Sequence, residues 1–170
     1  PAILNDSSFN RAIILITEHT DNNSVGFILN RPLDYTLQDL LPEIESDFVI
    51  YQGGPVEQDN LYFVHQVPEL IPESIKVDNG IFWGGNFESL KKLLSDGSLN
   101  KNDIRFFLGY SGWGKNQLED ELNSNSWFIS ENDIKNIFSK NEESLWKNKI
   151  LQQGGDYKLW ANAPSDINLN

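Results

Sequence analysis

Cysteine is absent from the 170 residues of the chain, which excludes disulfides, thiolate zinc sites, iron–sulfur clusters and cysteine nucleophiles. This absence fits a reducing compartment. No apolar run approaches the roughly 20 residues that a membrane-spanning helix requires. Methionine is absent as well and the chain begins at Pro1, so we interpret the sequence as a fragment or a processed form.

Basic residues are scarce, because 13 lysines and arginines stand against 25 acidic residues and give a net charge of −12. Nucleic-acid binding draws much of its affinity from basic side chains that replace counterions on phosphates. The densest basic group is interrupted by acidic residues and consists of Lys135, Lys140, Lys147 and Lys149. The field of the whole molecule would repel DNA and anionic membranes, so direct DNA binding is not expected and the acidity is interpreted as aiding solubility.

The length favours one domain, residues 1–170, with a core that needs no cross-links. β-Branched and aromatic runs predict strands at 11–17, 25–30, 48–52, 61–66, 74–77, 81–83, 104–109 and 127–130. Capping and periodicity predict helices at 37–41, 87–94, 117–122, 132–138 and 142–152. The first two strands read as a hairpin in the centre of the sheet. Because hairpins dominate the first half and no regular βαβ rhythm is present, we expect an α+β fold with a largely antiparallel sheet.

Residues 109–116 (GYSGWGKN) match the phosphate-binding pattern G-x-x-x-x-G-K-[ST] at every position but the last. They lie in a predicted turn between a strand and a helix, as that pattern requires. Asn116 lacks the hydroxyl that would bind Mg²⁺, and Trp113 would crowd the interior of the loop. Nucleotide hydrolysis is therefore disfavoured, and anion binding beside Lys115, at the start of the next helix, is the better-supported alternative.

Ser111 begins to match the nucleophile pattern G-x-S-x-G, but the next glycine comes one position early. A serine nucleophile needs a histidine base, and the chain has only His19 and His65. Nothing in the sequence brings either one to Ser111, so we interpret it as a turn serine bonded to local backbone. The scarcity of histidine leaves only carboxylates as metal ligands. Their spacing around His19 matches no established site, so no metal is expected.

Two arginines stand beside predicted strands, where a guanidinium can bind a carboxylate or a phosphate. Arg31 follows Asn30 and is held by the proline after it, and Arg105 opens the run RFFLG. The alternative is that each arginine ties the sheet together through a backbone carbonyl or an acidic neighbour. The sequence alone leaves both interpretations open.

Glycine pairs follow apolar runs at 53–54, 84–85 and 154–155. They either line one rim of the sheet, where ligands often bind, or only allow sharp bends. Tyr110 and Trp113 lie inside the predicted turn after residue 109, where small polar residues are usual. They form either a functional lip or a plug that packs on the core.

Five motifs follow one another along the chain: Phe9 with Arg11 and ILIT, GFILNRP at 26–32, GGPV at 53–56, FWGG at 82–85, and RFFLGYSGWG with QLE at 105–119. In this order they resemble the YqgE/AlgH family of bacterial proteins over almost the whole chain. The resemblance implies a small intracellular α+β protein whose bifurcated sheet folds into a pseudo-barrel with helices outside. Some members are labelled transcriptional regulators on genetic grounds, and no catalytic residue or cofactor is implied. Lys115 departs from the family pattern, which further disfavours nucleotide binding.

Two classes of function follow. We favour a non-enzymatic cytoplasmic protein, either a regulator or a module that binds a protein partner or a small anionic ligand. The alternative is an enzyme acting on a phosphorylated or carboxylated small molecule, with Arg31 and His65 in one cleft. Partner binding instead requires Tyr110 and Trp113 partly exposed on an apolar patch. The candidate binding residues are Asn30, Arg31, His65, Arg105, Tyr110, Ser111, Trp113 and Lys115.

Overall fold

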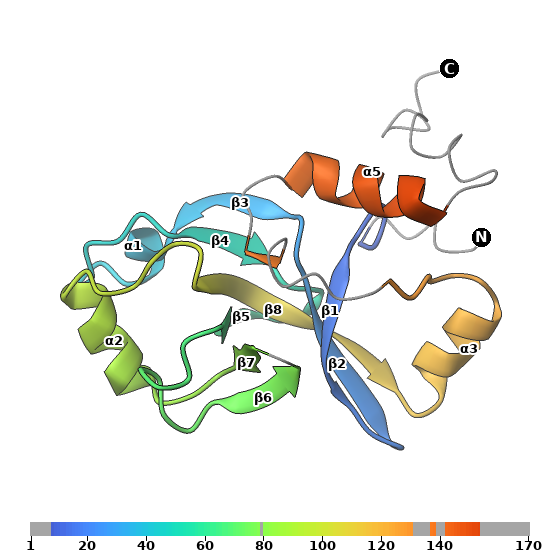
Figure 1. The fold of residues 1–170 in the computed structure, drawn as a ribbon, viewed down its shortest axis with the longest axis horizontal. Helices are drawn as coiled ribbons and strands as arrows, with labels where there is room; N and C mark the ends of the chain where they lie inside the picture. Colours follow the sequence, from blue (N-terminus) through green and yellow to red (C-terminus); the bar gives the residue numbers. More distant parts are fainter. Residues whose placement is uncertain (1–7, 79, 131–136, 139–141, 154–170) are drawn as a thin grey trace.

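The computed structural model describes residues 8–78, 80–130, 137–138 and 142–153 (Figure 1). Its strands are β1 (Ile14–His19), β2 (Asn23–Ile28), β3 (Pro32–Thr36), β4 (Val49–Gln52), β5 (Val56–His65), β6 (Ile75–Asp78), β7 (Ile81–Trp83) and β8 (Ile104–Gly114). Its helices are α1 (Leu37–Leu40), α2 (Phe87–Ser95), α3 (Gln117–Asn123) and α5 (Glu142–Gln153). The expected α+β class is confirmed, since helices accompany a sheet in which all strand pairs but one among the described residues are antiparallel.

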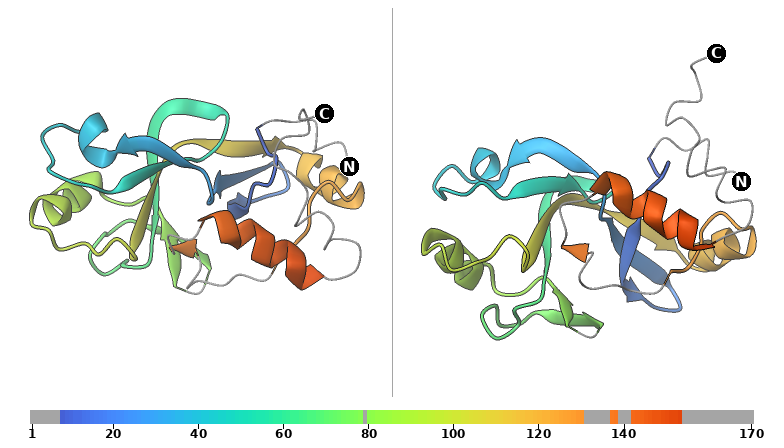
Figure 2. Two further views of the ribbon diagram at one scale, coloured as in Figure 1. Left: turned by 90° about the horizontal axis from the view of Figure 1, so that it is seen from above. Right: turned by 45° about the horizontal axis from the view of Figure 1, so that its top comes forward.

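The long strand β8 is the axis of the sheet. Its first half pairs in parallel with β4 on one edge and antiparallel with β5 on the other. Its second half, residues 111–114, pairs antiparallel with β2. Because β2 and β4 occupy successive parts of β8, the sheet divides into a β1–β2 branch and a β3–β4 branch (Figures 1 and 2). This is the bifurcation that the family resemblance implied.

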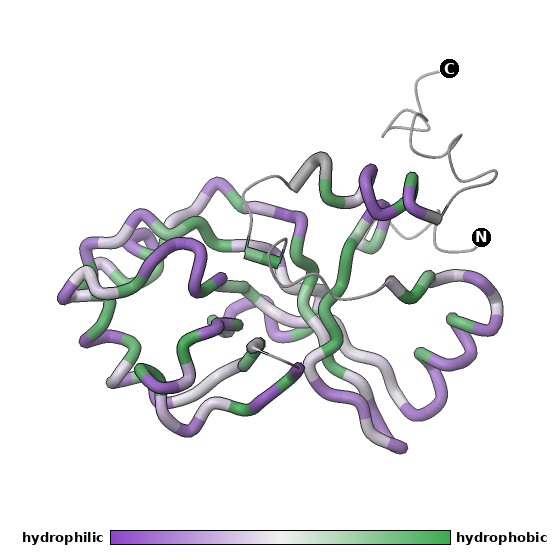
Figure 3. The backbone as a smooth tube through the Cα atoms, in the orientation of Figure 1, coloured by the Kyte–Doolittle hydropathy of each residue, from purple (hydrophilic) through white to green (hydrophobic). Residues whose placement is uncertain are grey.

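The main path of the sheet curls toward closure. It runs in the order β1-β2-β8-β5-β7-β6, and its end strands, β1 and β6, approach each other. The sheet is thereby nearly closed into a barrel. Hydrophobic residues are concentrated where β1 and β2 cross β8, whereas the tip of the β1–β2 hairpin is hydrophilic (Figure 3).

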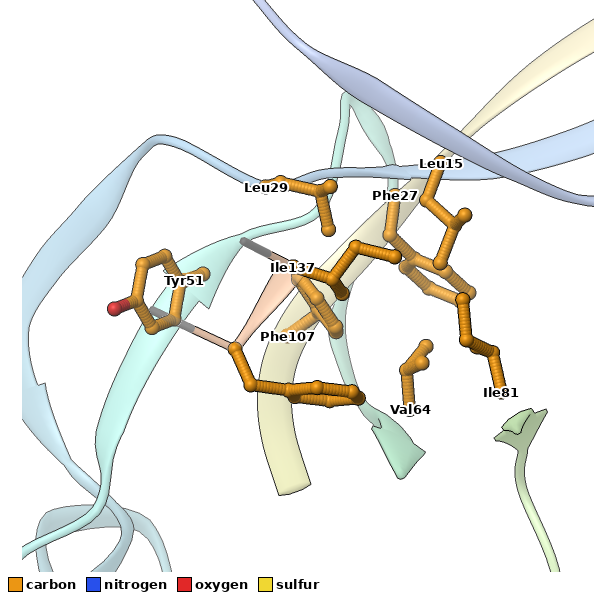
Figure 4. Packing of buried hydrophobic residues seen from close by; sticks show 9 residues of the cluster. Leu15, Phe27, Leu29, Tyr51, Val64, Ile81, Phe107 and Ile137 are labelled. Atoms are coloured by element: carbon orange, nitrogen blue, oxygen red, sulfur yellow. The ribbon is translucent and has the colours of Figure 1, made fainter. Parts of the chain in front are cut away.

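Alternation along β8 produces a hydrophobic core on each of its faces. Phe107 points into the barrel and stacks on Phe27 of β2, with ring centroids 4.9 Å apart. Figure 4 shows this inner core, which comprises Leu15, Phe27, Leu29, Tyr51, Val64, Ile81, Phe107, Ile137 and Phe138. Phe106 points to the opposite face, where Leu37 of α1 and Leu90 of α2 cover it. The barrel interior is therefore filled by side chains from both ends of the chain.

Helix α5 lies across the start of the β1–β2 branch (Figures 1 and 2). The guanidinium of Arg11 stands 4.9 Å from the ring centroid of Trp146 in this helix, and Leu145 is buried. A cation over an aromatic face stabilises such a contact by roughly 0.5–2 kcal/mol. The segment before β1 thus helps to position α5.

Most of the predicted elements are confirmed to within a few residues. Asn86 caps α2, because its Oδ1 accepts the backbone N–H of Ser89 at 2.9 Å. At α1, the carboxylate of Asp39 accepts the backbone N–H of Thr36 at 2.7 Å, as the capping box requires. Helix 132–138 was predicted where only residues 137 and 138 are described, and the glycines at 154–155 lie outside the described residues.

Three expectations were wrong, and one strand was missed. The strand predicted to end at residue 109 continues to Gly114, so the expected glycine-rich turn is part of β8. Residues 127–130 form no strand. The chain after Arg31 enters a further strand, β3, that the sequence pattern did not indicate. The first hairpin is not central, because β1 ends the main path of the sheet.

Candidate functional site

Asn30 and Arg31 hold the segment that precedes β1. The side-chain oxygen of Asn30 accepts the backbone N–H of Ile13 at 2.8 Å. The guanidinium of Arg31 donates to the backbone carbonyls of Ser8 and Asn10, the second at 2.9 Å. Both side chains therefore serve the chain's own backbone, which agrees with the structural alternative for Arg31.

Arg105 lies inside the fold and not on a rim. Its side chain is buried and donates to the carbonyl of Leu29 at 2.6 Å. The guanidinium also lies 4.2 Å from the ring centroid of Tyr51. The arginine on β8 thus links β4 to the end of the β1–β2 branch. It does not face solvent, where an anionic ligand would arrive.

The segment that partly matches the phosphate-binding pattern is extended. Residues 109–114 continue the ladder of β8, so their N–H groups do not curl around an anion. Ser111 is buried and donates its hydroxyl to the carbonyl of Gly53 at 3.0 Å. The expectation of a turn serine bonded to local backbone was wrong, because Ser111 stands in a strand and its acceptor is the backbone of a residue 58 positions earlier in the chain. Lys115 is exposed just beyond the strand.

Trp113 anchors α3 to the sheet. Its indole N–H donates to Glu121 Oε2 at 2.9 Å, and the indole N–H of Trp127 donates to the same oxygen at 2.6 Å. Phe9 stacks on Trp113, with ring centroids 6.2 Å apart. Trp113 is only 4% exposed. It therefore packs on the core, as the second alternative stated, and does not form an exposed lip of a functional site. The sequence did not indicate Glu121, the acceptor that aligns both indoles.

His65 is completely buried at the end of β5. Its Nδ1 accepts the backbone N–H of Val67 at 3.2 Å, and its Nε2 donates to the carbonyl of Gly84 at 3.1 Å. Burial lowers the pKa of His65 below its ordinary value of 6.5, although the Gly84 carbonyl acts in the opposite direction. None of these partners is Arg31, whose guanidinium donates to the carbonyls of Ser8 and Asn10.

The buried imidazole predicts that stability falls in acid. Because the pKa of His65 is lower in the folded protein, the unfolded chain binds its proton first. The stabilisation that neutral His65 gives the folded protein is therefore present above pH 6.5 and is lost as the pH falls through the folded pKa. Between pH 8 and pH 5, the free energy of unfolding measured in urea is expected to fall more steeply for the wild type than for His65→Gln. Glutamine keeps a hydrogen-bond donor and an acceptor at this position but does not titrate. Parallel curves for the two proteins would contradict this assignment.

The remaining candidate, Tyr110, belongs to a surface that we call the Tyr62–Tyr110 site. Tyr110 on β8 and Tyr62 on β5 are both half-buried and meet edge to face, with centroids 5.7 Å apart. The hydroxyl of Tyr62 donates to Glu57 Oε2, and the Asn60 amide donates to the same atom at 2.8 Å. Glu57 is exposed, and its other carboxylate oxygen has no hydrogen-bond partner among the described residues.

The electrostatics of this site favour a positively charged ligand. The hydrogen bond from Tyr62, followed by that from Asn60, lowers the pKa of Glu57, so the carboxylate stays ionised. Burial and the Glu57 hydrogen bond raise the pKa of Tyr62, which stays a neutral donor. An anion beside two phenol rings suits an ammonium or guanidinium group. The sequence did not indicate Glu57 or Tyr62, because a looped-out stretch of β5 opposite β8 brings them together.

Two other kinds of site were sought in the described part of the chain. No group of three or more histidine, aspartate or glutamate side chains is placed to hold a metal ion there. No helix in the same ranges is long and apolar enough to cross a bilayer.

Comparison with other sequences gives consistent matches over most of the chain. A family model described as AlgH-like matches residues 1–158. A UPF0301 protein of Cytophaga hutchinsonii is 42% identical over 169 residues, which cover 98% of this chain and 93% of the relative. A UPF0301 protein of Chlorobium limicola is 38% identical over 170 residues, which cover 99% of this chain and 91% of the relative.

Two solved structures share the fold. A crystal structure of a Corynebacterium diphtheriae protein superposes with a TM-score of 0.75 at 20% identity, covering 92% of this chain and 85% of that one. The solution structure of the AlgH protein from Pseudomonas aeruginosa superposes with a TM-score of 0.72 at 22% identity, covering 96% and 90%. At these identities the likeness establishes the nearly closed barrel and its peripheral helices.

Proposed function

This chain belongs to the AlgH-like family, and from that premise we propose that it is a cytoplasmic binding protein without a reaction of its own. One observation carries the proposal. His65, Ser111 and Arg105 are buried, and each is hydrogen-bonded to the protein's own backbone. Groups held in this way are not presented to a substrate. The regulatory role implied by the resemblance would then be exerted by binding.

The Tyr62–Tyr110 site is the surface that we assign to binding. Its ligand is a lysine or arginine side chain of a protein partner, held between the Glu57 carboxylate and the phenol rings. The net charge of −12 supports this choice, because the field of the molecule attracts basic partners and repels DNA. A small anionic ligand, the other candidate, would be repelled by Glu57.

The proposal is tested by titrating the isotopically labelled protein with N-acetyl-arginine methylamide and following backbone amide NMR signals. The signals of residues 57, 60, 62 and 110 are expected to shift together. Glu57→Gln is expected to weaken binding about fivefold, since an exposed charge contact contributes at most roughly 1 kcal/mol. Asp59→Asn is the matched control, because it removes the same charge from a neighbouring exposed residue.

The outcomes separate the alternatives. Equal weakening by the Glu57 and Asp59 variants would mean that only the overall charge attracts the probe, and shifts elsewhere would remove the assignment. The enzyme alternative gains support only if substrates turn over and His65→Gln abolishes that turnover while the variant stays folded. Neither result is expected from the burial of His65.

A further inference from the structure

Three exposed apolar residues lie in or next to segments that neighbour each other in the fold. Their side chains are 41%, 55% and 39% exposed and belong to Leu70, Ile75 and Phe87, which we call the Ile75 patch. The backbone N–H of Asn86 donates to the carbonyl of Pro72 at 2.8 Å, which ties the start of α2 to the segment before β6. Ile75 pairs with Trp83, a few residues before α2. In Figure 1 these segments lie together along the β6 and α2 side of the molecule.

The stretch of chain that carries the Ile75 patch is nearly neutral, whereas the whole chain is strongly acidic. Residues 69–92 carry four acidic side chains and three basic ones, namely Glu69, Glu73, Asp78, Glu88, Lys76, Lys91 and Lys92. This stretch therefore contributes only −1 to the net charge of −12. The ammonium of Lys91 lies 6.0 Å from the ring centroid of Phe87, so charge and apolar surface adjoin directly.

We propose that the Ile75 patch is the contact through which two copies of this chain associate. Two molecules that each carry a charge of −12 repel each other, so they approach best through a face that is locally neutral. A twofold contact is self-complementary, because it sets each segment of one copy against the patch of the other. Lysines of one α2 then meet glutamates of its partner, around a centre formed by Ile75 and Phe87. A different, strongly basic partner would find no excess of acidic residues here.

The first test is sedimentation equilibrium of the full chain over a range of concentrations. A concentration-dependent dimer is expected for the wild type. Ile75→Asp and Phe87→Asp are each expected to weaken it by at least about 30-fold, the effect of losing a central contact residue. Ile129→Asp is the matched control, since Ile129 is 80% exposed and lies in the segment after α3, a helix at the opposite end of the molecule from α2 in Figure 1. It is expected to leave the dimer unchanged.

A charge exchange tests the complementarity directly. Lys91→Glu with Lys92→Glu, and separately Glu69→Lys with Glu88→Lys, are each expected to give monomers, and an equimolar mixture of the two proteins is expected to restore the dimer. The proposal is overturned if the wild type stays monomeric up to about 0.2 mM. A dimer that the Ile129 variant disrupts as strongly as the patch variants do, or a mixture that stays monomeric, also overturns it.

Discussion

Gly54→Ala is expected to remove about 4 kcal/mol or more of the free energy of unfolding. A Cβ on residue 54 would lie 2.2 Å from the carbonyl carbon and oxygen of Tyr110 and 2.4 Å from the nitrogen of Ser111. All three atoms belong to the backbone of the central strand β8, so no change of rotamer can relieve the overlap. Thermal unfolding followed by circular dichroism is expected to show a melting temperature lower by about 8 °C or more.

Gly84→Ala provides the control from another Gly-Gly pair. Gly84 has a φ of +65°, but apart from its two chain neighbours no atom of the described residues lies within 4 Å of a Cβ built there. Alanine at this position therefore meets only the strain of the left-handed conformation, about 1 kcal/mol. If the melting temperature falls much further in Gly54→Ala than in Gly84→Ala, the cause is steric crowding and not backbone conformation. Similar melting temperatures would show that β4 and β8 can move apart and that Gly54 is not required for their close approach.

The glycine pair at 53–54 also shows what the sequence can decide. The pattern predicted either a ligand rim or sharp bends of the sheet, and the structure shows a close approach of two backbone segments instead. The N–H of Gly53 donates to Leu108 at 2.8 Å, and its carbonyl accepts from Ile28 at 2.9 Å. The pair thus stands where β2, β4 and β8 converge. No local signal distinguishes these two uses of glycine, because the partner strands are distant in sequence.

Local chemistry explains the expectations that were confirmed. The hairpin of β1 and β2 and the caps of α1 and α2 depend on residues within a few positions of one another. The extent of β8 depends instead on pairing with β2, some 85 to 91 residues earlier in the chain. Its glycines at 109, 112 and 114 resembled a turn, but the ladder to β2 makes them a strand. Tertiary pairing overrode the local preference there.

The candidate site shows the same limit. Tyr110 was indicated because a bulky aromatic stood in an apparent turn, and it is half-exposed beside Tyr62. Trp113 gave the same signal and is buried against α3. Successive segments of one strand thus place one aromatic at the surface and another inside. Glu57 carried no signal at all, since it is one of 25 acidic residues and becomes distinctive only through its contact with Tyr62.

Arg105→Met is expected to lower the free energy of unfolding by about 3 kcal/mol. The substitution keeps an apolar chain in the core but leaves the buried carbonyl of Leu29 without this donor, which costs about 1–3 kcal/mol. It also removes the cation from the face of Tyr51, a contact that contributes up to roughly 2 kcal/mol in a desolvated place. Urea unfolding of the variant and the wild type at one pH measures the difference.

Two further variants decide whether Arg105 is structural or binds a ligand. Arg105→Lys is expected to lose less than Arg105→Met, because an ammonium can still donate to Leu29 but cannot stack as a plane. Lys115→Met removes an exposed charge beyond β8 and is expected to change stability by no more than about 0.5 kcal/mol. If Arg105→Met were as stable as Lys115→Met, the arginine would not be needed to join β4, β8 and the β1–β2 branch. A ligand-binding role for Arg105 would then regain support, because a structural role would no longer explain why a cation is buried in this core.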